Sequence, residues 1–222
     1  YWATSDADAE VSLRPFVGLI GDISISSDLF HCSQRMSRQA RSAIAAAEKL
    51  GISTGVISVA QPGSDEGVGV VGELPPGESA VMVRGRAAKE LAGAMSKTAW
   101  SEFVRCPHED LRDPGRVHVD PLGHLHVCQG ITMGNLFRRP LVDIVAEYDP
   151  DAHSVVGPLL RGGPAELVQN YGLPHADGYA DACHLCYEAR LAMRERFPDV
   201  LGPDQMYGGM EAGEVLGDSA AN

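Results

Sequence analysis

The sequence lacks three features that would each have indicated a particular class of protein. No apolar run approaches the roughly 20 residues needed to cross a bilayer, and no basic segment leads into an apolar stretch as in a secretory signal. No cluster of Lys and Arg is long enough to neutralise a row of phosphates, and the 222-residue chain has a formal net charge of −12. We therefore expect neither a membrane nor a nucleic acid as a partner.

The composition is otherwise that of an ordinary globular protein. Apolar residues make up 44% of the chain and charged residues 22%, which is enough to bury a core. The five cysteines are an odd number in a chain without a secretion signal, which predicts a reducing, cytoplasmic compartment. Cysteines there are more often metal ligands, catalytic groups or buried side chains than disulfide partners.

The first hundred residues alternate between strand and helix patterns. Strands are expected at 22–27, 53–60 and 79–83, and helices at 38–50 and 85–97. Ser37 is a suitable cap for the first of these helices, and Gly51 a suitable end. This order predicts parallel strands joined by right-handed crossovers. Three such strands are too few to close a barrel, so the βα portion is expected to be incomplete.

A different pattern follows at residues 116–128, RVHVDPLGHLHVC. Alternating residues on either side of an Asp-Pro-Leu-Gly turn predict a hairpin. The alternation places His118, His124, His126 and Cys128 on one face of it. His124 and His126 are candidates for a mixed metal site with Cys128, although a solvated hairpin face is the favoured interpretation. Beyond the hairpin the chain is expected to be helical and irregular, with a frayed tail from Gly208.

Four cysteines at element ends or in loops make a candidate metal site. Cys183 and Cys186 form a CxxC at the start of a helix, Cys106 precedes the hairpin and Cys128 ends it. Four thiolates suit either zinc or a 4Fe–4S cluster, and the spacing does not choose between them. A thiol-redox pair ranks third, because this CxxC does not follow a strand within a βαβ unit. Cys32 lies apart and is expected to be a buried core residue.

Two stretches, VHVDPLGHLHVCQGITMGNL and ACHLC, resemble the C-terminal region of radical SAM enzymes that carry a SPASM or twitch extension. In those extensions a hairpin of the form D-P-x-G-x-x-x-x-C delivers a cysteine to an auxiliary 4Fe–4S cluster. A Gly-Asn-Leu follows, here Gly134-Asn135-Leu136, and then a short helix such as PLVDIVAEY. The first half of the chain is similar to the later strands of the radical SAM barrel.

The resemblance implies roles for particular residues. Cys106, Cys128, Cys183 and Cys186 would ligate one auxiliary cluster, closer to the twitch type. Ser26, Ser27 and Asp28 follow a strand at the place where the barrel presents polar groups to SAM and substrate. Arg84 follows another strand and would meet the SAM carboxylate or the substrate. The competing interpretations are a Ser/Asp cluster that caps a helix and a surface arginine.

The sequence also departs from the family. It contains no CxxxCxxC for the SAM-binding cluster, and the Gly-rich stretch of the second strand is absent. We therefore expect the C-terminal part of a longer enzyme that acts on a small-molecule or peptide substrate, and we do not expect this chain alone to cleave SAM. The expected fold is α/β, a partial parallel (β/α) barrel at 1–100 followed by a small α+β cluster-binding domain at 101–207 and a tail at 208–222. The alternative is a zinc-stabilised, non-enzymatic binding module that uses the same four cysteines.

Overall fold

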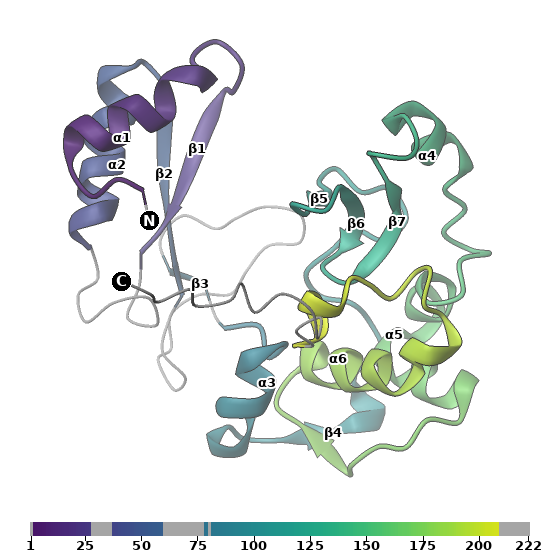
Figure 1. The fold of residues 1–222 in the computed structure, drawn as a ribbon. Helices are drawn as coiled ribbons and strands as arrows, with labels where there is room; N and C mark the ends of the chain where they lie inside the picture. Colours follow the sequence, from purple (N-terminus) through teal and green to yellow (C-terminus); the bar gives the residue numbers. More distant parts are fainter. Residues whose placement is uncertain (1, 28–36, 60–77, 80, 209–222) are drawn as a thin grey trace, which may run out of the picture. The chain divides into compact units, whose positions relative to one another are not determined.

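The computed structural model describes residues 2–27, 37–59, 78–79 and 81–208. They form a mixed α/β structure that divides into two compact units, Tyr1–Val81 and Met82–Asn222 (Figure 1). Over these ranges the strands make small sheets and no closed barrel. In the same part of the chain, none of the helices combines the length and apolar character that a membrane crossing requires.

The first unit is a small parallel sheet with two helices. In chain order its elements are α1 (Asp6–Leu13), a 3-10 turn (Arg14–Phe16), β1 (Asp22–Ser26), α2 (Arg38–Lys49), β2 (Ser53–Val59) and β3 (Glu78–Ser79). The strands lie in the order β1-β2-β3, and both pairs are parallel. The predicted strand–helix–strand arrangement is confirmed here, and α1 is an addition to it.

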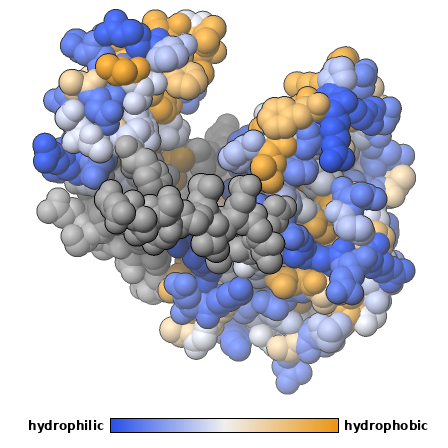
Figure 2. All heavy atoms as spheres, viewed as in Figure 1, coloured by the Kyte–Doolittle hydropathy of each residue, from blue (hydrophilic) through white to orange (hydrophobic). Residues whose placement is uncertain are grey.

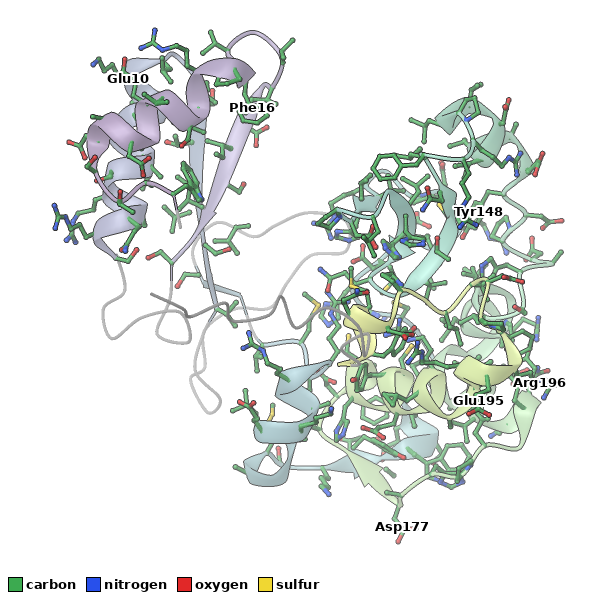
Figure 3. All side chains as sticks on the ribbon, in the orientation of Figure 1. Glu10, Phe16, Tyr148, Asp177, Glu195 and Arg196 are labelled. Atoms are coloured by element: carbon green, nitrogen blue, oxygen red, sulfur yellow. The ribbon has the colours of Figure 1, made fainter. Side chains whose placement is uncertain are left out.

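Helix α2 begins and ends where the sequence predicts. The Ser37 hydroxyl accepts a hydrogen bond from the Ala40 N–H at 3.0 Å, which satisfies one of the free donors of the first turn. Gly51 follows the helix with a φ of +73°, a left-handed conformation that favours glycine. Buried alanines such as Ala43 and Ala47 face Ile25 and α1 in one small core. At the surface, Glu10 of α1 (labelled in Figure 3) pairs with Lys49 of α2.

The segment after β3 differs from the prediction. The strand expected at 79–83 pairs with β2 only at Glu78–Ser79, and residue 80 lies outside the described residues. The helix expected at 85–97 is shorter, and consists of α3 (Arg86–Glu90) and a following 3-10 turn. The Val83 N–H donates to the Asp181 carboxylate at 3.0 Å instead of to a sheet. This bond joins the segment to the C-terminal half of the chain. The second compact unit begins at Met82.

The second unit combines two small antiparallel sheets with helices. After α3 come β4 (Thr98–Ala99), β5 (His118–Val119), β6 (His124–Cys128), β7 (Ile131–Asn135), α4 (Leu141–Glu147), α5 (Val156–Tyr171), β8 (Gly178–Tyr179) and α6 (Ala182–Met193), with 3-10 turns at Ala92–Ala94, Trp100–Glu102, Arg194–Arg196 and Asp204–Tyr207. The predicted hairpin is β5–β6, with His118 opposite His126. A third strand, β7, extends it. Strands β4 and β8 pair separately.

One apolar core joins the sheet β5–β6–β7 to α5 and α6. Val127 and Ile131 of the sheet, Leu167 of α5, and Leu185 and Met193 of α6 are all at most 2% exposed. Apolar side chains lie on the surface, by contrast, at the end of the unit that carries the hairpin turn and α4 (Figure 2). Phe137, for example, is 78% exposed.

A kink in α5 creates room for the segment that precedes Cys106. Gly162 and Gly163 interrupt the helical dihedrals, and Gly163 has a φ of +64°. A Cβ atom added to Gly163 would lie 2.2 Å from the backbone nitrogen of Arg105. Beyond the kink, the Ala165 N–H donates to the Phe103 carbonyl at 3.1 Å. Gly163 thus lets residues 103–105 pass directly against α5. Of the expected tail 208–222, only Gly208 is within the described residues.

Candidate cysteine site

Three segments of the second unit bring the four predicted ligands into one environment. Cys106 lies between β4 and β5, Cys128 is the last residue of β6, and Cys183 and Cys186 lie in the first turns of α6. All four are free thiols whose side chains are partly exposed. Burial raises the pKa of the Cys106, Cys183 and Cys186 thiols, to about 11 for Cys186. Negative charge on the Cys128 sulfur contributes to the increase at each of them. We call these four residues the cysteine site.

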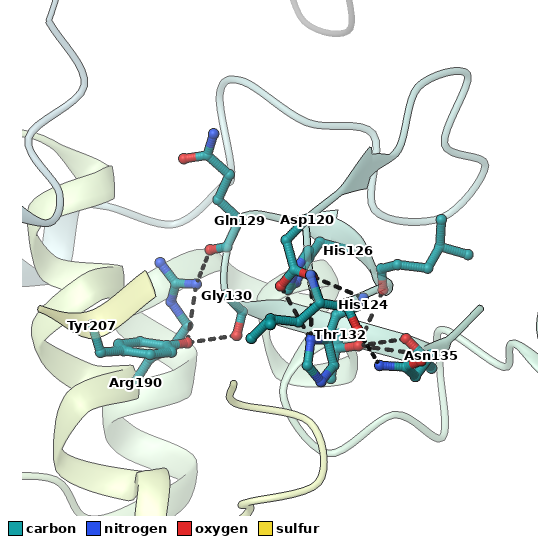
Figure 4. A network of polar contacts seen from close by, with 12 residues as sticks. Asp120, His124, His126, Gln129, Gly130, Thr132, Asn135, Arg190 and Tyr207 are labelled. Atoms are coloured by element: carbon teal, nitrogen blue, oxygen red, sulfur yellow. Dashed lines mark hydrogen bonds and ion pairs between the residues drawn. The ribbon is translucent and has the colours of Figure 1, made fainter. Parts of the chain in front are cut away.

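The hairpin turn fixes the direction in which β6 runs toward Cys128. The Asp120 Oδ1 atom accepts hydrogen bonds from the N–H groups of Leu122 and His124, both at 2.9 Å. Its Oδ2 atom lies 3.1 Å from the His126 Nε2 atom (Figure 4). Burial acts to raise the pKa of Asp120, but the hydrogen bonds from His124 and His126 outweigh it and the pKa is lowered.

The histidines of the hairpin do not form a solvated face. His126 is 0% exposed and is bound to Asp120, and the neighbouring His124 ring also contacts Asp120, at 3.1 Å. His118, opposite His126, lies 3.3 Å from the buried Glu109 carboxylate. The favoured interpretation of this face was therefore wrong for His126. The mixed site of His124, His126 and Cys128 is not supported either, because no three such side chains among the described residues are grouped as a site for a metal ion.

Asp181 positions the CxxC. It is the N-cap of α6, and its Oδ1 atom accepts a hydrogen bond from the His184 N–H at 2.6 Å. Its other carboxylate oxygen receives the N–H of Val83, the residue before Arg84. The first turn of a helix also favours negative charge on Cys183 and Cys186 through the helix dipole. The same carboxylate thus holds the CxxC and the segment that carries Arg84.

Two arginines face the cysteine site. The Arg84 Nη1 atom donates to the Cys128 sulfur at 3.6 Å. Arg190, one helical turn after Cys186, is 2% exposed and donates to the Gln129 carbonyl at 2.8 Å and to the Cys186 carbonyl at 3.3 Å. Sequence reasoning missed Arg190. Its signal was the i+4 spacing from Cys186, which places a cation on the same helix face as a ligand.

Tyr207 completes the packing around Arg190. Its hydroxyl donates to the Gly130 carbonyl at 2.6 Å and accepts from the Arg190 guanidinium at 3.4 Å (Figure 4). Gly130, with a φ of +85°, leaves the space that the phenol fills, since an added Cβ would lie 2.8 Å from the hydroxyl. The Gln129–Gly130 turn, directly after Cys128, is therefore held by two side chains from the C-terminal region.

The donor chemistry of the cysteine site fits a soft metal centre. Four thiols and two guanidinium groups combine the ligands that zinc or iron–sulfur clusters use with positive charge to offset thiolates. Across the ranges that the structure describes, no three His, Cys, Asp or Glu side chains are grouped as a site for a metal ion. The case for a metal at the cysteine site therefore rests on its residue types and not on a grouped arrangement of ligands.

The other predicted site residues lie in different places. Ser26 is exposed at the end of β1, beside a cavity of about 310 Å³ that Ser24 and Ser37 also line. Ser27 is buried, and its hydroxyl accepts from the Ser37 N–H at 3.2 Å, as a structural serine near a helix start would. Asp28 and Cys32 lie outside the described residues. Contact of these residues or of Arg84 with SAM stays a prediction.

Comparison with known proteins adds no family to this description. No protein-family model matches the sequence, and no curated protein or solved structure gives a significant match. The function is therefore argued from the cysteine site and from the motifs that surround it.

Proposed function

We propose that this chain is the C-terminal portion of a radical SAM enzyme and that Cys106, Cys128, Cys183 and Cys186 ligate an auxiliary 4Fe–4S cluster. The observation that carries the proposal is the cysteine site itself. Its thiols come from three segments of the sequence, influence one another's pKa values and lie beside two arginines. Four cysteine thiols are the ligand set that a 4Fe–4S cluster uses.

The arrangement of the chain is consistent with this assignment. The parallel strands β1, β2 and β3 with their crossover helix α2 are βα units of the kind from which (β/α) barrels are built. The hairpin with its Asp120 turn delivers Cys128, as in the resembling extensions. In the whole enzyme, SAM cleavage would give a 5′-deoxyadenosyl radical that abstracts hydrogen from a small-molecule or peptide substrate. The bound auxiliary cluster would supply electron transfer or a substrate-binding position.

The isolated chain is expected to bind the auxiliary cluster without cleaving SAM. It has no CxxxCxxC, the motif that holds the SAM-binding cluster in the family. In this proposal Ser26, Ser27, Asp28 and Arg84 contribute to the SAM and substrate region of the complete enzyme. Reading the coding sequence upstream of Tyr1 tests this part directly. A CxxxCxxC there supports the assignment, and a start codon at this position contradicts it.

The cluster is tested by anaerobic reconstitution of the full chain with iron and sulfide. We expect roughly four irons per chain, a brown absorbance and an EPR signal after reduction with dithionite. Cys183→Ala and Cys186→Ala should each lose most of the iron, whereas Cys32→Ala serves as the control and should retain it. A colourless product without iron would sink the cluster assignment.

The same experiment separates the two other interpretations of the cysteines. Stoichiometric zinc in protein from metal-replete cells, with no uptake of iron, favours the zinc-stabilised binding module. A thiol-redox protein predicts a reversible disulfide between Cys183 and Cys186 instead. Thiol labelling that is indifferent to oxidant excludes that third interpretation.

A further inference from the structure

Arg190 is a buried cation without a carboxylate partner in the part of the chain that the structure describes. Its guanidinium binds two backbone carbonyls, those of Gln129 and Cys186, and the hydroxyl of Tyr207. These neutral acceptors satisfy hydrogen bonds but carry no net charge. Burying a charge is strongly unfavourable unless an opposite charge accompanies it. The surroundings of Arg190 therefore call for a negative group.

The cysteine site adjoins Arg190 and can supply this charge, because the two carbonyls that bind the guanidinium belong to Cys186 and to Gln129, the residue after Cys128. Burial acts to lower the pKa of Arg190, whereas the ionised forms of Tyr207 and of the Cys186, Cys128 and Cys183 thiols act to raise it. Burial also raises the pKa of Tyr207 to about 12, so its phenol is neutral near pH 7. The remaining source of charge is the set of thiolates, which metal binding generates by displacing the protons of the thiols.

Arg84 provides a second positive charge from a different element. It lies just before α3, and the bond from the Val83 N–H to Asp181 fixes its backbone. Its guanidinium donates to the Cys128 sulfur at 3.6 Å, within the range of an N–H···S hydrogen bond. The two arginines thus converge on the same thiols.

We propose that Arg84 and Arg190 are positioning residues that stabilise the cysteine site in its anionic, metal-bound form and make the bound cluster easier to reduce. This inference rests on the proposed function. A cluster with four thiolate ligands becomes more negative when it accepts an electron, so fixed positive charge favours the reduced state. Net charge and hydrogen bonds to sulfur are among the features that set the reduction potential of such clusters.

The first test compares Arg84→Gln with Arg86→Gln in the reconstituted full chain. Both variants remove one positive charge from neighbouring positions, but Arg86 is exposed, whereas Arg84 donates to the Cys128 sulfur. A redox titration followed by EPR should show a lower potential for Arg84→Gln only, with iron content unchanged. A tenfold loss in the relative stability of the reduced state corresponds to a decrease of about 59 mV. Equal potentials in wild type and both variants overturn the inference.

Arg190 is tested by Arg190→Lys and Arg190→Met. We expect Arg190→Lys to keep most of the charge effect and Arg190→Met to lower both the iron content and the potential. Circular dichroism establishes whether each variant folds. If Arg190→Met does not fold, Arg84→Gln and Arg190→Lys carry the test, since Arg84 is only half-buried. A folded Arg190→Met with wild-type potential and iron content contradicts the role of Arg190.

Cadmium binding separates failure of this inference from failure of the proposed function. Cd²⁺ forms an anionic complex with four thiolates without sulfide or redox change, and its charge-transfer absorbance reports the affinity. We expect Arg84→Gln to bind Cd²⁺ about tenfold more weakly than Arg86→Gln, the size of one charge-assisted hydrogen bond. If wild type binds Cd²⁺ but takes up no iron, the cluster assignment fails and this ratio still decides the role of Arg84. If wild type takes up neither metal, both proposals are overturned.

Discussion

Each of the two units of this protein is stabilised internally by a different kind of interaction. In the first unit, short-range contacts among small apolar side chains dominate, such as Ala43 and Ala47 of α2 against β1. In the second unit, an apolar core is accompanied by polar contacts between residues far apart in sequence, including Arg190 with Gln129 and Tyr207 with Gly130. Among the described residues, the unit with the candidate site thus has long-range polar contacts within its core, whereas the long-range pair of Glu10 and Lys49 in the first unit lies at the surface.

The largest expected loss of stability comes from substituting Gly163 of the second unit, and Gly51 of the first unit provides the comparison. Gly163→Ala places a Cβ against the backbone of residues 103–105 at a φ of +64°. Gly51→Ala meets a similar φ, +73°, but none of the described residues has an atom within 4 Å of the added Cβ. We expect Gly163→Ala to cost roughly 3 kcal/mol or more and Gly51→Ala about 1 kcal/mol in the free energy of unfolding. Urea titration measures both, and equal costs would show that close backbone approach is unimportant in the second unit.

A smaller effect is expected when the buried carboxylate of the hairpin is neutralised. Asp120→Asn removes the charge that His124 and His126 contact, at a cost of about 2 kcal/mol near pH 7. Since the folded pKa of Asp120 is lowered, its contribution is present above the unfolded value of about 3.9 and is lost as pH falls through the folded value. The stability difference between wild type and Asp120→Asn should therefore narrow on acidification below about pH 4.

The control for this prediction is Asp110→Asn. Asp110 accepts two backbone N–H groups at 3.0 Å in a similar turn, but its side chain is exposed. Its substitution should cost less than that of Asp120 because water replaces the lost interactions. Denaturant titrations of both variants between about pH 3 and about pH 7, a window that begins below the ordinary carboxyl pKa, provide the comparison. An Asp120→Asn cost that is constant over this range contradicts the role given to its charge.

The smallest effect is expected at the helix cap of the first unit. Ser37→Ala removes the acceptor for the Ala40 N–H and should cost about 1 kcal/mol. Because Ser37 lies in the first unit, Cd²⁺ binding at the cysteine site should not change. Hydrogen exchange of α2 amides, measured beside a metal titration, checks both statements. A weakened metal affinity would show that the two units are energetically coupled.

The parts of the fold that the sequence predicted are those with local causes. The limits of α2 follow from Ser37 and Gly51, and the β5–β6 hairpin follows from its turn residues and alternation. Helix α1 was missed because it buries little more than Ala9 and Leu13 and so has hardly any apolar face. The kink at Gly163 was missed because its cause, the approach of residues 103–105, lies some sixty residues away in the chain.

The same distinction applies to the candidate site. The four cysteines were recognisable as a set from their residue type and their position at element ends. The burial of His126 and the position of Arg190 were not, because each depends on a partner distant in sequence or hidden by the fold. Alternation alone cannot tell a solvated face from one that a carboxylate such as Asp120 covers. Polar residues on a buried helix face, such as Arg190, are accordingly the ones to examine first beside a set of cysteines.

Asp181 gives the junction between the two units a role in the geometry of the site. One carboxylate carries both the first turn of α6 and the N–H of Val83, the second residue of the second unit. The Asp181 side chain therefore links the start of the second unit directly to the helix that bears Cys183 and Cys186. Arg84, next to Val83, moves with the same anchor. The Cys183 and Cys186 thiols and the Arg84 guanidinium are thus all carried by segments that hydrogen-bond to the same carboxylate, that of Asp181.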